Sequence, residues 1–131
     1  MVEVDNPYLV RIAQDWIAYY SSPEDTRDQD ANLFNPWDIV VLLVNHNGDW
    51  AWNFVLLVLE RDVVGKSLDI LAAGPTEDLI SLYGSVYIEA IEEGARSDGR
   101  FRSLLAGVWQ TDIKQEIWDR IVAARGDAIS F

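Results

Sequence analysis

The stretch Leu71-Ala72-Ala73-Gly74-Pro75-Thr76-Glu77-Asp78-Leu79-Ile80 predicts a joint between two helices with almost no loop between them. Glycine readily takes the left-handed conformation that ends a helix, so Gly74 is expected to close the first one. Proline suits the first position of a helix, where its missing N–H is no loss, so Pro75 is expected to open the second. Glu77 and Asp78 then fall in the first turn, beside the positive end of the helix dipole. These four residues are therefore expected to form a structural corner between two short crossing helices.

Apolar residues recur at three- and four-residue spacing along much of the chain, which predicts amphipathic helices. Gly84 is expected to break or bend the helix that begins at Pro75. The residues expected to cap helix N-termini are Asn6, Asn35, Asp49, Ser67 and Asp112. The sequence thus predicts an all-α fold, a compact orthogonal bundle of about seven or eight short helices, for which stacked helix pairs are one arrangement.

Residues 37–60 leave two interpretations open. Ile39–Val44 is apolar on every side, and the strong turn signal Asn47-Gly48 separates it from a second apolar run, which would suit a β-hairpin. The Asn35-Pro36 start and the length of the second run favour two buried helices instead. We expect two helices, with the hairpin as the alternative.

Two segments carry a family resemblance. Leu-Ala-Ala-Gly-Pro-x-Glu-Asp-Leu at residues 71–79 precedes Arg100-Phe101-Arg102-x-Leu104-Leu105-x-Gly107-Val108-Trp109. In order and spacing they resemble a group of small acidic bacterial all-helical domains of unknown function, over roughly residues 35–123. The resemblance implies a compact helical domain and supplies no activity and no catalytic residues. We expect residues 1–131 to form one domain, in which residues 1–34 add an N-terminal helix and an acidic loop to this core.

The composition predicts a soluble, cytoplasmic protein. Half of the residues are hydrophobic, including 6 Trp, 5 Tyr and 4 Phe, which is not the composition of a disordered chain. The chain has no cysteine, so disulfides and thiolate sites are excluded. Residues 1–5 are acidic and lack the features of a signal peptide, and the longest apolar runs are too short to span a bilayer.

The charge is strongly and unevenly negative. Twenty-two acidic and 10 basic residues give a net charge of −12. Residues 1–62 hold 11 acidic residues against 3 basic ones, whereas residues 63–131 hold 11 against 7. Such a surface repels phosphate backbones, so we expect no direct binding to nucleic acid. It suits a basic partner, or it serves solubility.

Neither metal binding nor cofactor binding is predicted. Asp28-x-Asp30-x-Asn32 copies the first ligand positions of a calcium loop, but the sixth position is Leu33 instead of Gly. The twelfth position is Ile39 instead of Glu. A solvated acidic loop is the simpler interpretation. One histidine and no cysteine also make a zinc site improbable.

No catalytic residues are predicted either. His46 is the only histidine, lies in a predicted turn and has no nucleophile motif beside it. Glu77 and Asp78 are the best-placed carboxylates for an enzyme. Their simpler role is to stabilise a helix start, with Arg100 or Arg102 as the partners of an ion pair.

The tryptophans divide into two groups. Trp16, Trp109 and Trp118 lie on helical stripes and are expected in the core. Trp37, Trp50 and Trp52 lie near helix starts, and we expect at least one to be partly exposed. An exposed tryptophan beside an acidic loop is typical of a protein-binding surface. The residues expected to bind a partner are Glu24, Asp25, Asp28, Asp30 and Trp37.

The predicted function is therefore protein binding, of the kind in which an inhibitor or immunity protein masks a basic toxin or nuclease. The partner is expected to be a protein and not a membrane, and the sequence does not give the oligomeric state. Three alternatives stay open. They are a structural subunit without a ligand, a phage-type nucleic-acid mimic that uses the Glu89–Glu93 row, and an enzyme that uses Glu77, Asp78 or His46.

Overall fold

The computed structural model describes residues 6–131, so the acidic stretch of residues 1–5 lies outside the described residues. The elements are α1 (Pro7–Tyr20), the 3-10 turn η1 (Arg27–Gln29), α2 (Trp37–His46), α3 (Gly48–Arg61), α4 (Leu68–Leu71), the π-helical turn η2 (Ala72–Thr76), α5 (Glu77–Ser97), α6 (Gly99–Ala106) and α7 (Gln115–Arg125). The all-α prediction is confirmed, and residues 37–60 form two helices. Because α4, η2 and α5 are continuous, the described span holds six separate helical rods, slightly fewer than expected.

The stretch at residues 71–80 contains no corner. Gly74 does not take the left-handed conformation, and the Glu77 N–H bonds to the Ala72 carbonyl five residues earlier, as in a π-helix. The prediction that one helix closes at Gly74 and another opens at Pro75 is wrong. In an α-helix the Pro75 ring would clash with the carbonyl four residues before it, and the wider π turn accommodates it.

The absent side chain of Gly74 allows a close approach between two elements. A Cβ on Gly74 would lie 3.2 Å from the ring of Trp37, so glycine lets the start of α2 pack against η2. The backbone departs from helical geometry later, at Tyr83 in α5 (φ −130°, ψ 19°). This kink lies next to Gly84, where the sequence predicted a break or bend.

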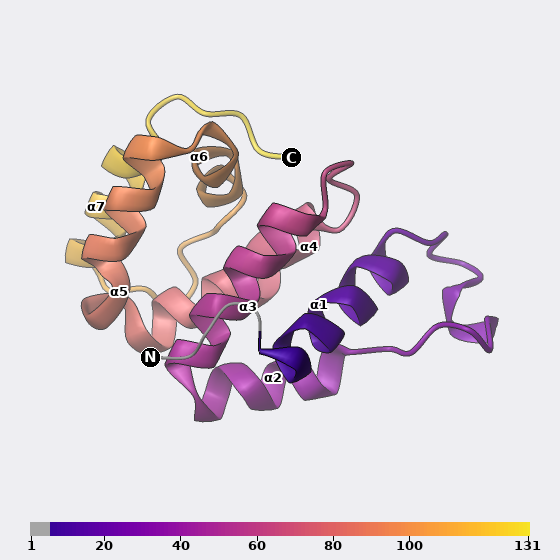
Figure 1. Ribbon diagram of the computed structural model, residues 1–131. Coiled ribbons are helices and arrows are strands. Elements are labelled where there is room, and N and C mark those ends of the chain that lie inside the picture. Colours follow the sequence, from indigo (N-terminus) through magenta and orange to yellow (C-terminus); the bar gives the residue numbers. More distant parts are fainter. Residues whose placement is uncertain (1–5) are drawn as a thin grey trace.

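The helices pack in two groups on either side of α3 and α4. In Figure 1, α1 and α2 lie to the right and below, α5, α6 and α7 lie to the left, and α3 and α4 run through the centre. The most extensive contacts between helices are those of α1 with α3 and of α5 with α7. One cluster of buried apolar side chains extends from Leu9 to Ile121. No helix within residues 6–131 is both long and apolar enough to cross a bilayer.

Trp16 is fully buried in this core, as predicted, but the prediction for Trp109 is wrong. Helix α6 ends at Ala106, so Trp109 lies in the following loop and 73% of its surface is exposed. Trp118 is half-buried beside the core. Trp109 has helical spacing in the sequence, but it does not reach the core because the helix ends before it.

The predicted cap is correct at the first helix. The Asn6 side chain accepts the Tyr8 N–H (2.9 Å) and caps α1. The Asn35 side chain accepts the N–H of Trp37, the first residue of α2 (3.0 Å), but the cap position of α2 is Pro36, one residue after the predicted cap. At α3 the cap is Asn47 and not Asp49.

Two further caps are not formed. Ser67 is in the cap position of α4, but its hydroxyl donates to the buried Asp62 carboxylate (2.6 Å) and accepts no N–H from the helix start. Helix α7 begins at Gln115 with Lys114 in the cap position, so the capping box predicted for Asp112 is wrong. Local sequence signals locate these helix starts to within a few residues without fixing the cap.

Candidate functional site

The acidic loop, residues 21–36, joins α1 to α2 and carries four of the five predicted partner-binding residues. The side chains of Glu24, Asp25, Asp28 and Asp30 are all exposed. Figure 1 shows the loop reaching out beyond the helices at the right-hand edge of the molecule. None of these four carboxylates forms an ion pair with any residue in the span 6–131.

Arg27 is the one basic residue of the acidic loop, and it faces inward. Its guanidinium carbon lies 5.2 Å from the ring centroid of Tyr19 and 5.2 Å from that of Tyr20, both at the end of α1. One of its nitrogens also donates to the Ser22 carbonyl (2.8 Å). These contacts between a cation and aromatic rings hold the positive charge against α1, so it does not neutralise the outer surface of the loop.

Asp28 provides a second anchor. The Tyr19 hydroxyl donates a hydrogen bond to the Asp28 carboxylate. This hydrogen bond, together with burial, raises the pKa of the Tyr19 phenol to about 12. Sequence reasoning missed both Tyr19 and Arg27 as parts of the site. The available signal was a pair of tyrosines at the end of a helix, followed within nine residues by a lone arginine in an acidic segment.

We expect the change Tyr19→Phe to loosen the acidic loop while leaving the core intact. Losing this hydrogen bond should cost about 1 kcal/mol, and the effect should be local because the phenyl ring can stay in place. The measurement is the rate at which trypsin cleaves after Arg27, which should rise severalfold over wild type. The control is Tyr8→Phe, since Tyr8 is 72% exposed on the same helix. Equal cleavage rates in all three proteins would show that Tyr19 does not anchor the loop.

Trp37 lies where the acidic loop meets α2, and it contributes to the fold as well as to the surface. Its ring stacks on that of Trp16 with a centroid separation of 6.2 Å and also packs against Gly74. The remaining 37% of its surface is exposed. The structure therefore places the five predicted residues in one segment, with Trp37 at its base.

The three residues considered for catalysis, all within the described span, share no hydrogen bond or ion pair with one another. His46 is exposed at the end of α2, and the Glu77 carboxylate accepts a hydrogen bond from the Thr111 hydroxyl. Partial burial and the charge of Glu77 raise the pKa of Asp78. Adjacent residues on a helix do not face each other, so Glu77 and Asp78 are not a facing carboxylate pair.

Arg100 and Arg102 bind backbone carbonyls, so the predicted ion pairs with Glu77 or Asp78 are wrong. Arg100 donates to the carbonyls of Leu59 (2.8 Å) and Asp62 (2.6 Å), at and just beyond the end of α3. Arg102 donates to the Ala95 carbonyl (2.6 Å). Both arginines thus connect α6 to other parts of the fold.

The calcium-like segment also has no ligand set in the described part of the chain. Residues 6–131 contain no group of three or more His, Asp or Glu side chains that could hold a metal ion. The Asp28 carboxylate is turned toward Tyr19, and one Asp30 oxygen accepts the Asn32 N–H (2.9 Å). These side chains therefore stabilise the loop itself.

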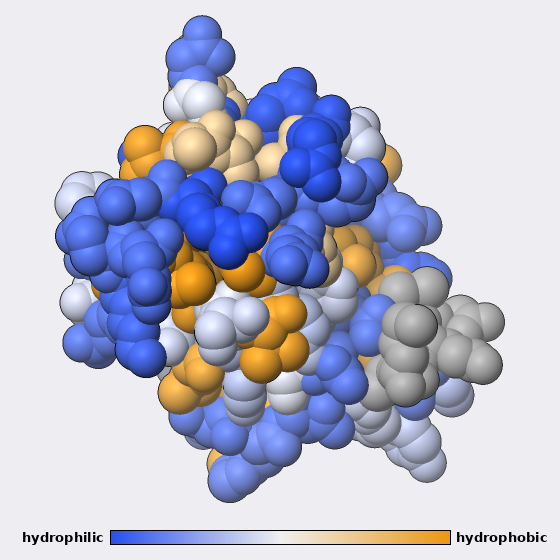
Figure 2. All heavy atoms as spheres, turned by 90° about the vertical axis from the view of Figure 1, so that its left-hand side faces the viewer, coloured by the Kyte–Doolittle hydropathy of each residue, from blue (hydrophilic) through white to orange (hydrophobic). Residues whose placement is uncertain are grey.

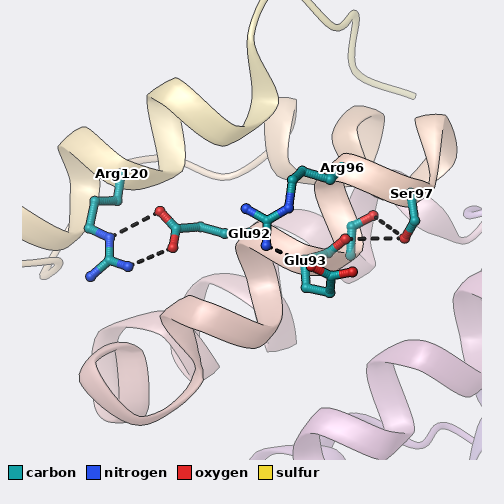
Figure 3. Close-up of polar contacts among 6 residues, drawn as sticks. Glu92, Glu93, Arg96, Ser97 and Arg120 are labelled. Carbon is teal, nitrogen blue, oxygen red and sulfur yellow. Dashed lines mark hydrogen bonds and ion pairs between the residues drawn. The ribbon is translucent and has the colours of Figure 1, made fainter.

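On the other side of the molecule, arginines bind the carboxylates of α5. Arg120 of α7 donates twice to Glu92, at 3.0 and 2.5 Å, and Arg96 donates to Glu93 at 2.6 Å. Figure 3 shows how these side chains point toward one another. The hydrogen bond from Arg120 lowers the pKa of Glu92. On the face where α5 and α7 lie, Figure 2 shows mostly hydrophilic side chains with small apolar patches between them.

Residues 22–129 match a family of unknown function (DUF6869), and the chain therefore belongs to that family. The match is wider than the resemblance over roughly residues 35–123, and it includes nearly all of the acidic loop. No curated protein and no solved structure is significantly similar to the chain.

Proposed function

We propose that this member of the DUF6869 family is a protein-binding domain that engages a basic partner through the acidic loop. The observation that carries the proposal is the arrangement of the loop's charges. Four exposed carboxylates lie on a segment whose single arginine is turned inward onto Tyr19 and Tyr20. The partner in this proposal is a basic toxin or nuclease whose active surface the acidic loop masks.

The anchoring of the loop makes it suitable for recognition. A segment held in place before binding loses less conformational entropy when the complex forms. Uncompensated carboxylates also attract a basic surface over a distance of about 10 Å at moderate ionic strength and raise the association rate. Both effects predict a complex that forms fast and weakens with added salt.

The nucleic-acid mimic is less well supported than protein masking. It needs a row of free carboxylates, and two of the acids in the Glu89–Glu93 row are bound by Arg96 and Arg120. The enzyme alternative has less support, because Glu77, Asp78 and His46 share no hydrogen bond or ion pair.

A structural subunit is the second candidate, and Trp109 is the observation that favours it. This exposed ring borders a cavity of about 310 Å³ that α4, Gly107 and Phe131 also line. An exposed tryptophan beside a cavity suits an apolar interface that salt does not dissociate.

The test is a pull-down from the source cell with a variant in which the loop is neutral. This variant carries Glu24→Gln, Asp25→Asn, Asp28→Asn and Asp30→Asn, which remove the charge but keep the hydrogen-bond acceptors. The control variant neutralises four exposed acids in the second half of the chain, Glu89, Asp112, Glu116 and Asp127. The two variants have the same net charge, so a difference between them reports the position of the charges and not their number.

We expect the wild type and the control variant to retain the same basic protein, and the loop variant to lose most of it. Neutralising the four carboxylates of the acidic loop should weaken binding at least tenfold, or about 1.4 kcal/mol. Equal retention by both variants would contradict the assignment of the loop. A partner that stays bound at high salt and is lost on Trp109→Ala would favour the structural subunit instead.

A further inference from the structure

A cavity of about 480 Å³ lies between the end of α3, the end of α5 and the start of α6. Its inner surface is apolar, because Leu59 and Phe101 are almost completely buried beneath it and Leu56 is half-buried beside them. Figure 1 shows that α5 and α6 lie on the opposite side of the molecule from the acidic loop. The cavity is therefore separate from the site described above.

Two exposed carboxylates stand at the rim of this cavity. Glu60 is the penultimate residue of α3, and Asp98 is the N-cap of α6. One Asp98 oxygen accepts the Arg100 N–H (2.9 Å), which fixes the carboxylate at the rim. Apolar walls with negative charge at the opening match a side chain that has an aliphatic stem and a positive end.

Arg100 also lines the cavity, but its guanidinium is already hydrogen-bonded to backbone carbonyls. It donates to the Leu59 and Asp62 carbonyls and lies 5.8 Å from the ring centroid of Phe131. Its single charge leaves the two rim carboxylates in excess. The cavity therefore favours a cation over an anion.

We infer that this cavity binds the side chain of a lysine or arginine from a protein partner. The methylene stem packs against Leu56, Leu59 and Phe101, and the cation binds the carboxylates of Glu60 and Asp98. The inference rests on the lining of the cavity and does not depend on the acidic loop.

The probe is Nα-acetyl-lysine N-methylamide, added to the ¹⁵N-labelled full chain and followed by the backbone amide signals of Gly94 and Ser97, which line the cavity. The matched neutral probe is the norleucine derivative, which has the same stem without the ammonium group. We expect the lysine probe to shift these amides in a saturable manner and to bind at least tenfold more tightly than the norleucine probe.

Two variants separate the contributions of charge and shape. The double change Glu60→Gln and Asp98→Asn removes the rim charge, and asparagine caps a helix as well as aspartate does. The change Gly94→Ala adds a methyl group at the cavity wall, where a Cβ lies 3.4 Å from the Phe101 ring, an ordinary contact. Both changes should weaken binding of the lysine probe about tenfold, and neither should lower the melting temperature appreciably.

The control for the rim is the double change Glu116→Gln and Asp127→Asn, which should leave probe binding unchanged. Equal shifts with the lysine and norleucine probes, unchanged binding to the rim variant, or no saturable shift at Gly94 and Ser97 would each overturn the inference. None of these results bears on the acidic loop, whose amides report separately in the same spectra.

Discussion

Replacing Trp16 by alanine is expected to lower the free energy of unfolding by about 4 kcal/mol, the largest effect of any single change considered for this chain. Trp16 is fully buried, and its ring centroid lies 4.4 Å from that of Tyr20 and 5.6 Å from that of Phe54. Its indole N–H points to the Ser67 carbonyl (3.4 Å). One side chain thus joins α1 to α3 and to the residue before α4, and its removal leaves a large cavity.

Urea unfolding followed by circular dichroism measures this effect, and Trp109→Ala is the matched control. The same chemical change at Trp109 removes a ring that is 73% exposed, so it should cost less than about 1 kcal/mol. Similar losses for the two variants would mean that Trp16 does not occupy the centre of the core.

Replacing Asp62 by alanine is expected to lower the free energy of unfolding by about 3 kcal/mol at neutral pH. The Asp62 side chain is buried and accepts hydrogen bonds from the Gly65 N–H (2.8 Å), the Ser67 N–H (2.9 Å) and the Ser67 hydroxyl (2.6 Å). Alanine would leave these donors without an acceptor. The turn that leads into α4 should therefore lose its support.

The loss should depend on pH in a defined direction. Burial alone would raise the pKa of Asp62, but the hydrogen bonds from Ser67 and Gly65 and the charge of Arg100 outweigh it and lower the pKa. A lowered pKa in the folded state adds stability that is fully present above the unfolded pKa of about 3.9 and is lost as the pH falls through the folded value. The difference between wild type and Asp62→Ala should therefore be constant from pH 7 to about pH 5 and shrink below about pH 4.

Urea unfolding at several pH values measures this dependence. Asp127→Ala serves as the control, because Asp127 is exposed beyond the end of α7. A difference between wild type and Asp62→Ala that persists undiminished at low pH would show that the ionised carboxylate does not provide the stability.

The helical class of the fold was predictable from the sequence because helical periodicity and proline starts are local signals. Asn6 caps the first helix as its sequence indicates. The interpretation of Gly74-Pro75 as a corner was wrong because the same two residues serve either a helix end or a π turn. The packing of Trp37 on Gly74 distinguishes the two, and that contact joins residues 37 positions apart.

The charge of the acidic loop was also predictable, whereas its anchoring was not. Exposure of Glu24, Asp25, Asp28 and Asp30 follows from a polar segment between two apolar stripes. The position of Arg27 over Tyr19 and Tyr20 requires the loop to fold back onto α1, which no local pattern specifies. The contacts of Arg100 were likewise not predictable from local sequence, since it binds carbonyls 41 and 38 residues away.

The measurement that tests the central proposal most directly is the affinity for the captured partner as a function of salt. Calorimetry from about 50 to about 300 mM NaCl compares the wild type with the loop variant that carries the four neutral replacements. Over this range the Debye length shortens, so the attraction between exposed charges is increasingly screened. We predict that the wild-type affinity falls steadily with salt, and that the loop variant binds weakly at every concentration with little salt dependence. Equal affinities and equal salt dependence in the two proteins would contradict a binding role for the acidic loop.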